Sequence, residues 1–325
     1  MAVTPSFIEN EIRKRCNNIP DVISIILMGS CARGEETYFL NEHGEKELMS
    51  DYEVLIAVKS AEGTSDVDKA LKQLQNELLS LSHSECFDLE WSYKTIAEIE
   101  RLDKRFIFFE TKEAKKVITG DKDIFTHFPD INISNLNYSE LNTIILHRMY
   151  HVIRDMNSGD EKYKKYVIAR NSLDFASAFL PLTGRLVSSY SERMKALKKI
   201  SLEYGVPQDL INRHNDYLTM KLDYNSNLYH HYSLDSMYEY FYHDVVLLDE
   251  LQRKFQHGKR FRTDYRRIIS AIYRMDLHNL YNSLLLGRKL NRLFEEMLSI
   301  IKVREINKNR LADIQGKMKD LFGYC

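Results

Sequence analysis

The sequence predicts an α+β domain, built from a mixed sheet with flanking helices, followed by an all-α helical domain. Up to about residue 122, short apolar runs alternate with amphipathic stretches, and beyond Leu136 only the helical pattern remains. Glycine and proline number only 12 and 5 in 325 residues, which disfavours long loops and disordered tracts. A chain of this length accommodates two domains, and we divide it into residues 1–135 and 136–325.

Strands and helices alternate in the first domain. Runs rich in β-branched residues and bounded by turn residues predict strands, and apolar residues at helical spacing predict helices. The expected strands are 22–28, 52–58, 87–93 and 117–119, and the expected helices are 6–17, 66–81 and 95–103. The apolar stretch 106–109 clearly fits neither the period of a helix nor that of a strand. A long polar segment separates the first two strands, and His43-Gly44 within it predicts a turn.

The second domain is read as helical throughout. Ser139, Ser233 and Thr263 are suitable N-caps, and Pro207 suits a first helical turn. The expected helices are 139–155, 162–180, 188–204, 207–222, 233–256 and 263–322.

Charge divides the chain in the same way. Residues 1–132 carry a net charge of −9 and the remainder +8, which gives −1 in total. This asymmetry suits a site where carboxylates hold metal ions and cations hold a polyanion, although two differently solvated surfaces would also produce it. A near-neutral total disfavours extended nucleic-acid binding.

Nothing in the sequence predicts a membrane or secreted protein. The apolar run Val22 to Met28 is far shorter than the roughly 20 residues that a membrane helix needs, and no basic segment followed by an apolar one opens the chain. The four cysteines show no metal-ligand spacing, so we expect reduced thiols in a cytoplasmic protein.

The informative motif begins where the first strand ends. Gly29-Ser30 follows an apolar strand and leads into a short helix, an arrangement that offers backbone N–H groups and a hydroxyl to a phosphate. Arg33, in the same helix, is either a further phosphate ligand or an ordinary surface arginine.

Carboxylates occupy the next two strands. Asp51 and Glu53 lie two residues apart and should project from one face of their strand, where two like charges favour a bound cation such as Mg²⁺ or Mn²⁺. In the following strand Asp88 and Glu90 alternate with apolar residues, so either can be the third carboxylate. We favour Asp88. Three carboxylates and two metal ions are typical of phosphoryl transfer.

These motifs resemble the nucleotidyltransferase superfamily related to DNA polymerase beta, over about residues 20–122. The resemblance implies that Gly29 and Ser30 contact a triphosphate, that Asp51 and Glu53 bind both metal ions, and that Asp88 completes the site. The 20 residues between Ser30 and Asp51 exceed the spacing in compact members of the family.

We therefore expect a magnesium-dependent nucleotidyltransferase that uses ATP or another NTP as co-substrate and modifies an unidentified acceptor. A small-molecule acceptor is favoured because the total charge is near neutral. Lys165 and Arg170 of the helical domain are expected to reach the β and γ phosphates. The alternatives are an inactive NTP-binding or protein-interaction module, a second-messenger synthase, and an enzyme that modifies nucleic-acid ends.

Overall fold

The structure, a computed structural model, describes residues 2–84, 87–136, 138–158, 160–255, 292–304 and 308–322. The chain forms two compact units. The first comprises Met1–Asn137 together with two later segments, Leu186–Glu192 and Thr219–Ser226, and the second comprises the rest. No sequence pattern indicated that these two segments belong to the first unit.

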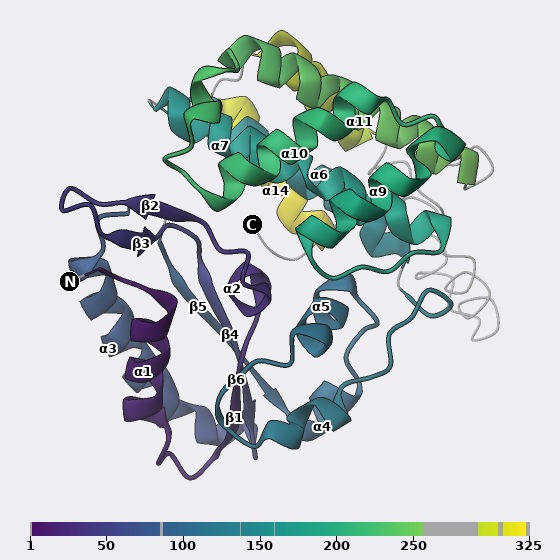
Figure 1. The fold of residues 1–325 in the computed structure, drawn as a ribbon. Helices are drawn as coiled ribbons and strands as arrows, with labels where there is room; N and C mark the ends of the chain where they lie inside the picture. Colours follow the sequence, from purple (N-terminus) through teal and green to yellow (C-terminus); the bar gives the residue numbers. More distant parts are fainter. Residues whose placement is uncertain are drawn as a thin grey trace. The chain divides into compact units, whose positions relative to one another are not determined.

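A four-stranded sheet forms the centre of the first unit (Figure 1), in the order β5-β4-β1-β6. Its strands are β1 (Val22–Leu27), β4 (Tyr52–Val58), β5 (Leu89–Thr95) and β6 (Val117–Gly120). β4 pairs with β5 in parallel, whereas β1 pairs antiparallel with both β4 and β6. The mixed sheet confirms the α+β class expected for this half of the chain.

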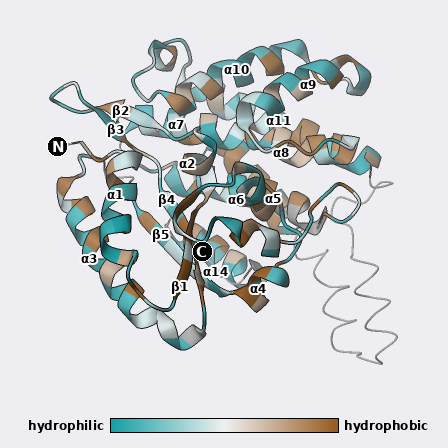
Figure 2. Cartoon of the chain, turned by 60° about the horizontal axis from the view of Figure 1, so that its bottom comes forward, coloured by the Kyte–Doolittle hydropathy of each residue, from teal (hydrophilic) through white to brown (hydrophobic). Residues whose placement is uncertain are grey.

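Both faces of this sheet are buried, because alternate side chains of β1 enter two different cores. Ile25 and Leu27 pack with α1 (Pro5–Cys16) and α3 (Ser65–Leu81). On the other face, Ile26 belongs to a second core, which includes residues of α4, α5 and a 3₁₀ helix, η2. These three elements are Ile96–Glu100, Phe106–Ala114 and Lys122–His127. Figure 2 accordingly shows β1 in the hydrophobic colour.

A hairpin accounts for the long interval between Ser30 and Asp51. After α2 (Gly29–Arg33), β2 (Tyr38–Leu40) pairs antiparallel with β3 (Lys46–Leu48). The expected turn is confirmed, with Gly44 at φ +74°. The second later segment joins this hairpin: Tyr224 N donates to Tyr38 O at 2.9 Å, and Leu40 N donates to Asn225 Oδ1 at 2.7 Å.

Helices build the second unit, as expected. They are α6 (Tyr138–Asp155), α7 (Glu161–Ser172), α8 (Asp174–Phe179), α9 (Tyr190–Tyr204), α10 (Gln208–Leu222), α11 (Leu234–Phe255) and α14 (Lys308–Phe322). The first residues of α9 and the last of α10 belong to the first unit.

Two expected helices are interrupted. The one predicted over 162–180 divides at Leu173 into α7 and α8, followed by a 3₁₀ turn, Leu180–Thr183. The helix predicted over 263–322 is described only in part, because residues 263–291 lie outside the described residues. A helix covers 292–303 and ends at Arg304, which adopts φ +62°. Among the described residues, no helix is long and apolar enough to cross a membrane.

Candidate functional site

The turn between β1 and α2 lies directly against a carboxylate. Gly29 adopts φ +63°, a left-handed conformation that favours glycine, and a Cβ atom there would lie 2.1 Å from Glu53 Oε2. Met28 N also donates a hydrogen bond of 2.9 Å to Glu53 O. Within the described chain, the hydroxyl of Ser30 has no hydrogen-bond partner. The turn and the acidic strand therefore form one local structure.

Asp51 immediately precedes β4, beside α2. Its carbonyl oxygen accepts a hydrogen bond of 3.7 Å from the Cys31 thiol. Burial raises the pKa of Cys31 to about 12, so this thiol stays protonated at neutral pH. Tyr52 is completely buried in the core with α1 and α3, and strand alternation places Glu53 on the opposite face.

The strand register places each of the two candidates for the third carboxylate beside one member of the acid pair, since Tyr52 pairs with Leu89 and the residues before them are Asp51 and Asp88. Glu53 is directly opposite Glu90 in the parallel pair of β4 and β5, so the two side chains share a face. Asp88 precedes β5, and its Oδ1 accepts hydrogen bonds from Gln75 Nε2 at 2.6 Å and Leu89 N at 2.8 Å.

The contact with Gln75 holds the Asp88 carboxylate toward α3. Gln75 lies on α3, and α3 covers the sheet face opposite to the one that carries Glu53. The geometry thus brings Glu90 beside Glu53 and gives Asp88 a hydrogen bond to a helix on the other side, while the preference for Asp88 that the sequence suggested stays a prediction.

Oxygen ligands of this kind suit a hard divalent cation such as Mg²⁺ or Mn²⁺. In the conformation seen, however, no three His, Cys, Asp or Glu side chains of the described residues lie close enough together to hold one ion. Asp51, Glu53 and Glu90 fit a metal by donor chemistry and strand position, and their side chains would have to converge by rotation.

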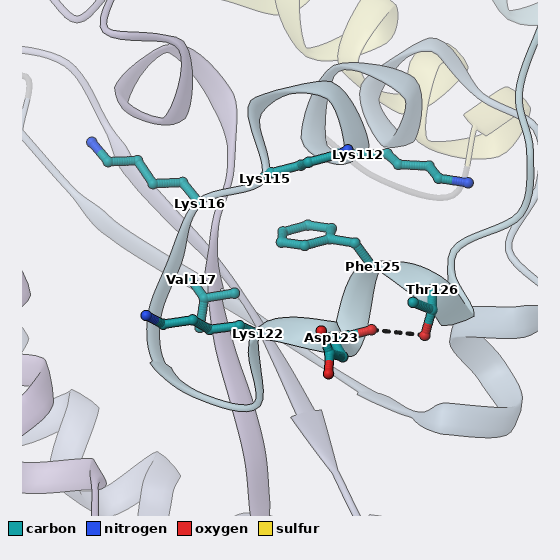
Figure 3. A pocket seen from close by; sticks show the side chains of 8 residues that line it. All are labelled: Lys112, Lys115, Lys116, Val117, Lys122, Asp123, Phe125 and Thr126. Atoms are coloured by element: carbon teal, nitrogen blue, oxygen red, sulfur yellow. Dashed lines mark hydrogen bonds between the residues drawn. The ribbon is translucent and has the colours of Figure 1, made fainter.

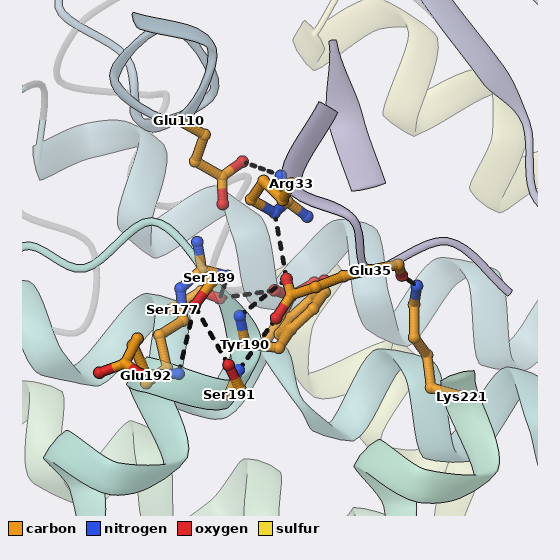
Figure 4. A network of polar contacts seen from close by, with 11 residues as sticks. Arg33, Glu35, Glu110, Ser177, Ser189, Tyr190, Ser191, Glu192 and Lys221 are labelled. Atoms are coloured by element: carbon orange, nitrogen blue, oxygen red, sulfur yellow. Dashed lines mark hydrogen bonds and ion pairs between the residues drawn. The ribbon is translucent and has the colours of Figure 1, made fainter. Parts of the chain in front are cut away.

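Arg33 has internal partners (Figure 4). Its side chain is only 8% exposed, with Nε 3.3 Å from Glu35 Oε2 and Nη1 3.0 Å from Glu110 Oε2. Burial by itself would lower the Arg33 pKa, but Glu110, Tyr190 and Glu35 raise it above its ordinary value. This arginine is therefore part of a buried ion-pair network and not an ordinary surface residue, and its role as a phosphate ligand stays a prediction.

Glu35 extends that network to the later segments of the first unit. Its carboxylate accepts hydrogen bonds from Tyr190 N at 2.9 Å and Ser191 N at 3.0 Å, at the start of α9, where a negative charge is favourable. Lys221 Nζ donates to the Glu35 carbonyl oxygen. Sequence reasoning missed this role because the partners lie more than 150 residues away, beyond the reach of any local pattern.

The two cations expected to bind phosphate in the helical unit also have neighbours of their own. Lys165 Nζ lies 2.7 Å from Glu161 Oε1 and donates to Tyr229 O at 3.1 Å. Burial would raise the pKa of Asp174, but Arg148, Arg193, a hydrogen bond from Ser177 and, least of all, Arg170 lower it. Their role as phosphate ligands stays a prediction.

No family model matches this chain, and no curated protein matches it. What the chain does must therefore be inferred from the acidic site itself and from the motifs of its sequence.

Proposed function

We propose that this chain is a metal-dependent nucleotidyltransferase, which transfers a nucleoside monophosphate from ATP or another NTP to a small-molecule acceptor. The observation that carries the proposal is the position of Glu53. Its carboxylate lies against the Gly29 turn, and its strand neighbours are Asp51 along the chain and Glu90 across the sheet.

The residues take complementary roles in this proposal. The backbone at Gly29 and the hydroxyl of Ser30 would receive the phosphates, and Asp51, Glu53 and Glu90 would hold Mg²⁺ or Mn²⁺. The metal ions would supply charge neutralisation for the phosphates. An acceptor oxygen attacks the α phosphorus, the bond from that phosphorus to the bridging oxygen breaks, and pyrophosphate leaves.

Substitution of the carboxylates tests this assignment. Asp51→Asn should abolish nearly all pyrophosphate release while the melting temperature stays equal or rises slightly, because one repulsive charge is removed. Glu90→Gln should have the same effect on turnover. Asp88→Asn is the matched control, since the amide oxygen can still accept from Leu89 N and activity should persist.

The assay is pyrophosphate release from labelled NTPs with Mg²⁺ across pools of small-molecule acceptors. Turnover at the wild-type rate in Asp51→Asn would contradict the proposal. Loss of turnover in Asp88→Asn with full activity in Glu90→Gln would instead restore Asp88 as the third carboxylate.

One observation favours a second candidate, a module that binds NTP without catalysis. No three potential ligands converge on one point among the described residues. Such a module would raise its melting temperature with a nonhydrolysable ATP analogue, yet would release no pyrophosphate with any acceptor pool.

A further inference from the structure

A hollow lined by lysines lies within the first unit, apart from the acidic site (Figure 3). It is an open depression of ≈ 630 Å³, formed by the end of α5, the start of β6 and η2, and Lys115, Lys116 and Lys122 within it are exposed. That volume is typical of small-molecule sites. Its lining includes four lysines and one carboxylate, namely Lys112, Lys115, Lys116, Lys122 and Asp123, together with the ring of Phe125.

Two of these ammonium groups form ion pairs with carboxylates elsewhere in the chain. Lys112 Nζ lies 2.6 Å from Asp130 Oδ1 and 3.1 Å from Phe128 O. Lys116 Nζ lies 3.6 Å from Glu9 Oε1. In the part of the chain that the structure describes, the side chains of Lys115 and Lys122 make no hydrogen bond or ion pair. Two unpaired cations therefore line the same hollow.

Backbone geometry sets Lys115 apart as well. It ends α5 with φ +50°, a left-handed conformation that glycine usually provides at this position. A residue with a side chain pays about 1 kcal/mol for that conformation. The strain is consistent with a function that requires a lysine here.

Phe125 gives the hollow an apolar wall. The residue is 7% exposed and belongs to the core on this side of the sheet, and in Figure 3 its ring lies between Lys115 and Lys122. Lys122 extends away from the ring in Figure 3, so the two exposed lysine side chains would turn toward a ligand that contacts the ring.

Hydrogen bonds at the end of β1 relate the hollow to the acidic site. Leu27 N donates to Lys116 O at 2.9 Å, and the next residue, Met28, donates to Glu53 O on the other side of β1. Since neighbouring strands are about 4.8 Å apart, the backbones of Lys116 and Glu53 are separated by about 10 Å. The hollow is adjacent to the carboxylates but separate from them.

We propose that this hollow binds a small molecule that carries a phosphate group. Lys115 and Lys122 hold the phosphate as point charges, and Phe125 contacts the organic part of the ligand. A nucleic-acid strand is disfavoured, because residues 1–132 carry a net charge of −9, which repels an extended polyanion. The site needs neither a metal ion nor nucleotide transfer.

Calorimetric titration of the full chain tests the site, with ribose 5-phosphate as the probe and ribose as its uncharged counterpart. The experiment uses Asp51→Asn protein in EDTA, so that the acidic site cannot bind phosphate through a metal. Ribose 5-phosphate should bind and ribose should not. The double variant Lys115→Gln/Lys122→Gln should weaken binding by about tenfold or more, because two charged hydrogen bonds are lost.

Matched variants separate a local effect from a general one. Lys59→Gln/Lys69→Gln removes two exposed lysines of the same unit that do not line the hollow, and its affinity should equal that of the parent. Lys115→Arg/Lys122→Arg retains both charges and should retain binding. The melting temperature of each variant reports whether the fold is intact.

Three outcomes would overturn the proposal: no binding of ribose 5-phosphate, equal binding of ribose, or equal weakening by the Lys59→Gln/Lys69→Gln control. Binding of a short RNA that depends on Lys115 and Lys122, without binding of ribose 5-phosphate, would also overturn it in favour of a nucleic-acid surface. Pyrophosphate release by the unmodified chain is measured separately, so the nucleotidyltransferase proposal can fail while this one stands.

Discussion

Two glycines that flank α2 allow backbone strain to be separated from the position of Glu53. Gly29 and Gly34 adopt φ +63° and +69°, so alanine should destabilise the fold by about 1–2 kcal/mol at either position. Only at Gly29 does the new Cβ atom meet a neighbour, the Glu53 carboxylate, whereas nothing lies within 4 Å at Gly34. Because the end of a glutamate side chain can move, Gly29→Ala should displace this carboxylate.

The prediction is a difference in metal binding at matched stability. Urea denaturation should show similar losses for Gly29→Ala and Gly34→Ala, and titration with Mn²⁺ should show weaker binding for Gly29→Ala alone. Equal Mn²⁺ affinity in the two variants would mean that the contact of Glu53 with the turn is irrelevant to the metal.

Single residues also show where sequence reasoning stops. The motif around Gly29 and the acid pair was recognisable because turn chemistry and strand alternation are local. The burial of Arg33 was not, since its partners Glu110 and Tyr190 are distant in sequence. A charged residue beside a phosphate-type turn can thus be structural, and only its contacts reveal this.

Among the elements, α6 carries two histidines that tie stability to pH. Burial lowers the pKa of His147 from 6.5 to about 4, and burial followed by repulsion from Arg148 lowers that of His151 to about 3. Below pH 6.5 the unfolded chain therefore binds protons that the folded chain does not, and stability falls as the pH decreases. The loss can reach about 1.4 kcal/mol per pH unit for each histidine.

Urea denaturation at pH 7, 6 and 5 measures this effect above the range where most carboxylates titrate. The wild-type chain should lose stability between pH 6.5 and 5, and His147→Gln/His151→Gln should lose much less. A double variant with the same pH dependence as the wild type would show that other groups control the acid response.

The elements differ in how well the sequence predicts them. The strand expected at 52–58 is confirmed without change, because Val54–Val58 is a continuous apolar run in which every second residue is β-branched. Phe106–Ala114 is a helix that the sequence left undecided, since consecutive apolar residues fit neither period. Strand register is even harder to predict from sequence. Alternation shows that Asp88 and Glu90 both alternate with apolar residues, but it does not show which residue is opposite Glu53.

At the scale of the whole molecule, the chain returns twice to the first unit after Asn137. Composition and periodicity classed 186–192 and 219–226 with the helical half, and correctly predicted helix for parts of them. Their attachment depends on single contacts such as Glu35 with the start of α9, and on Asn225 with the hairpin. No periodic pattern carries that information.

In the proposed function, Asp51, Glu53 and Glu90 form a divalent-metal site that works together with an NTP. The most direct test is a titration with Mn²⁺ in the presence of a nonhydrolysable ATP analogue. Electron paramagnetic resonance measures how much Mn²⁺ is bound. The wild type and Asp88→Asn should bind Mn²⁺ alike, and Asp51→Asn and Glu90→Gln should each weaken binding by about tenfold or more. Equal Mn²⁺ affinity in all four proteins would contradict the account.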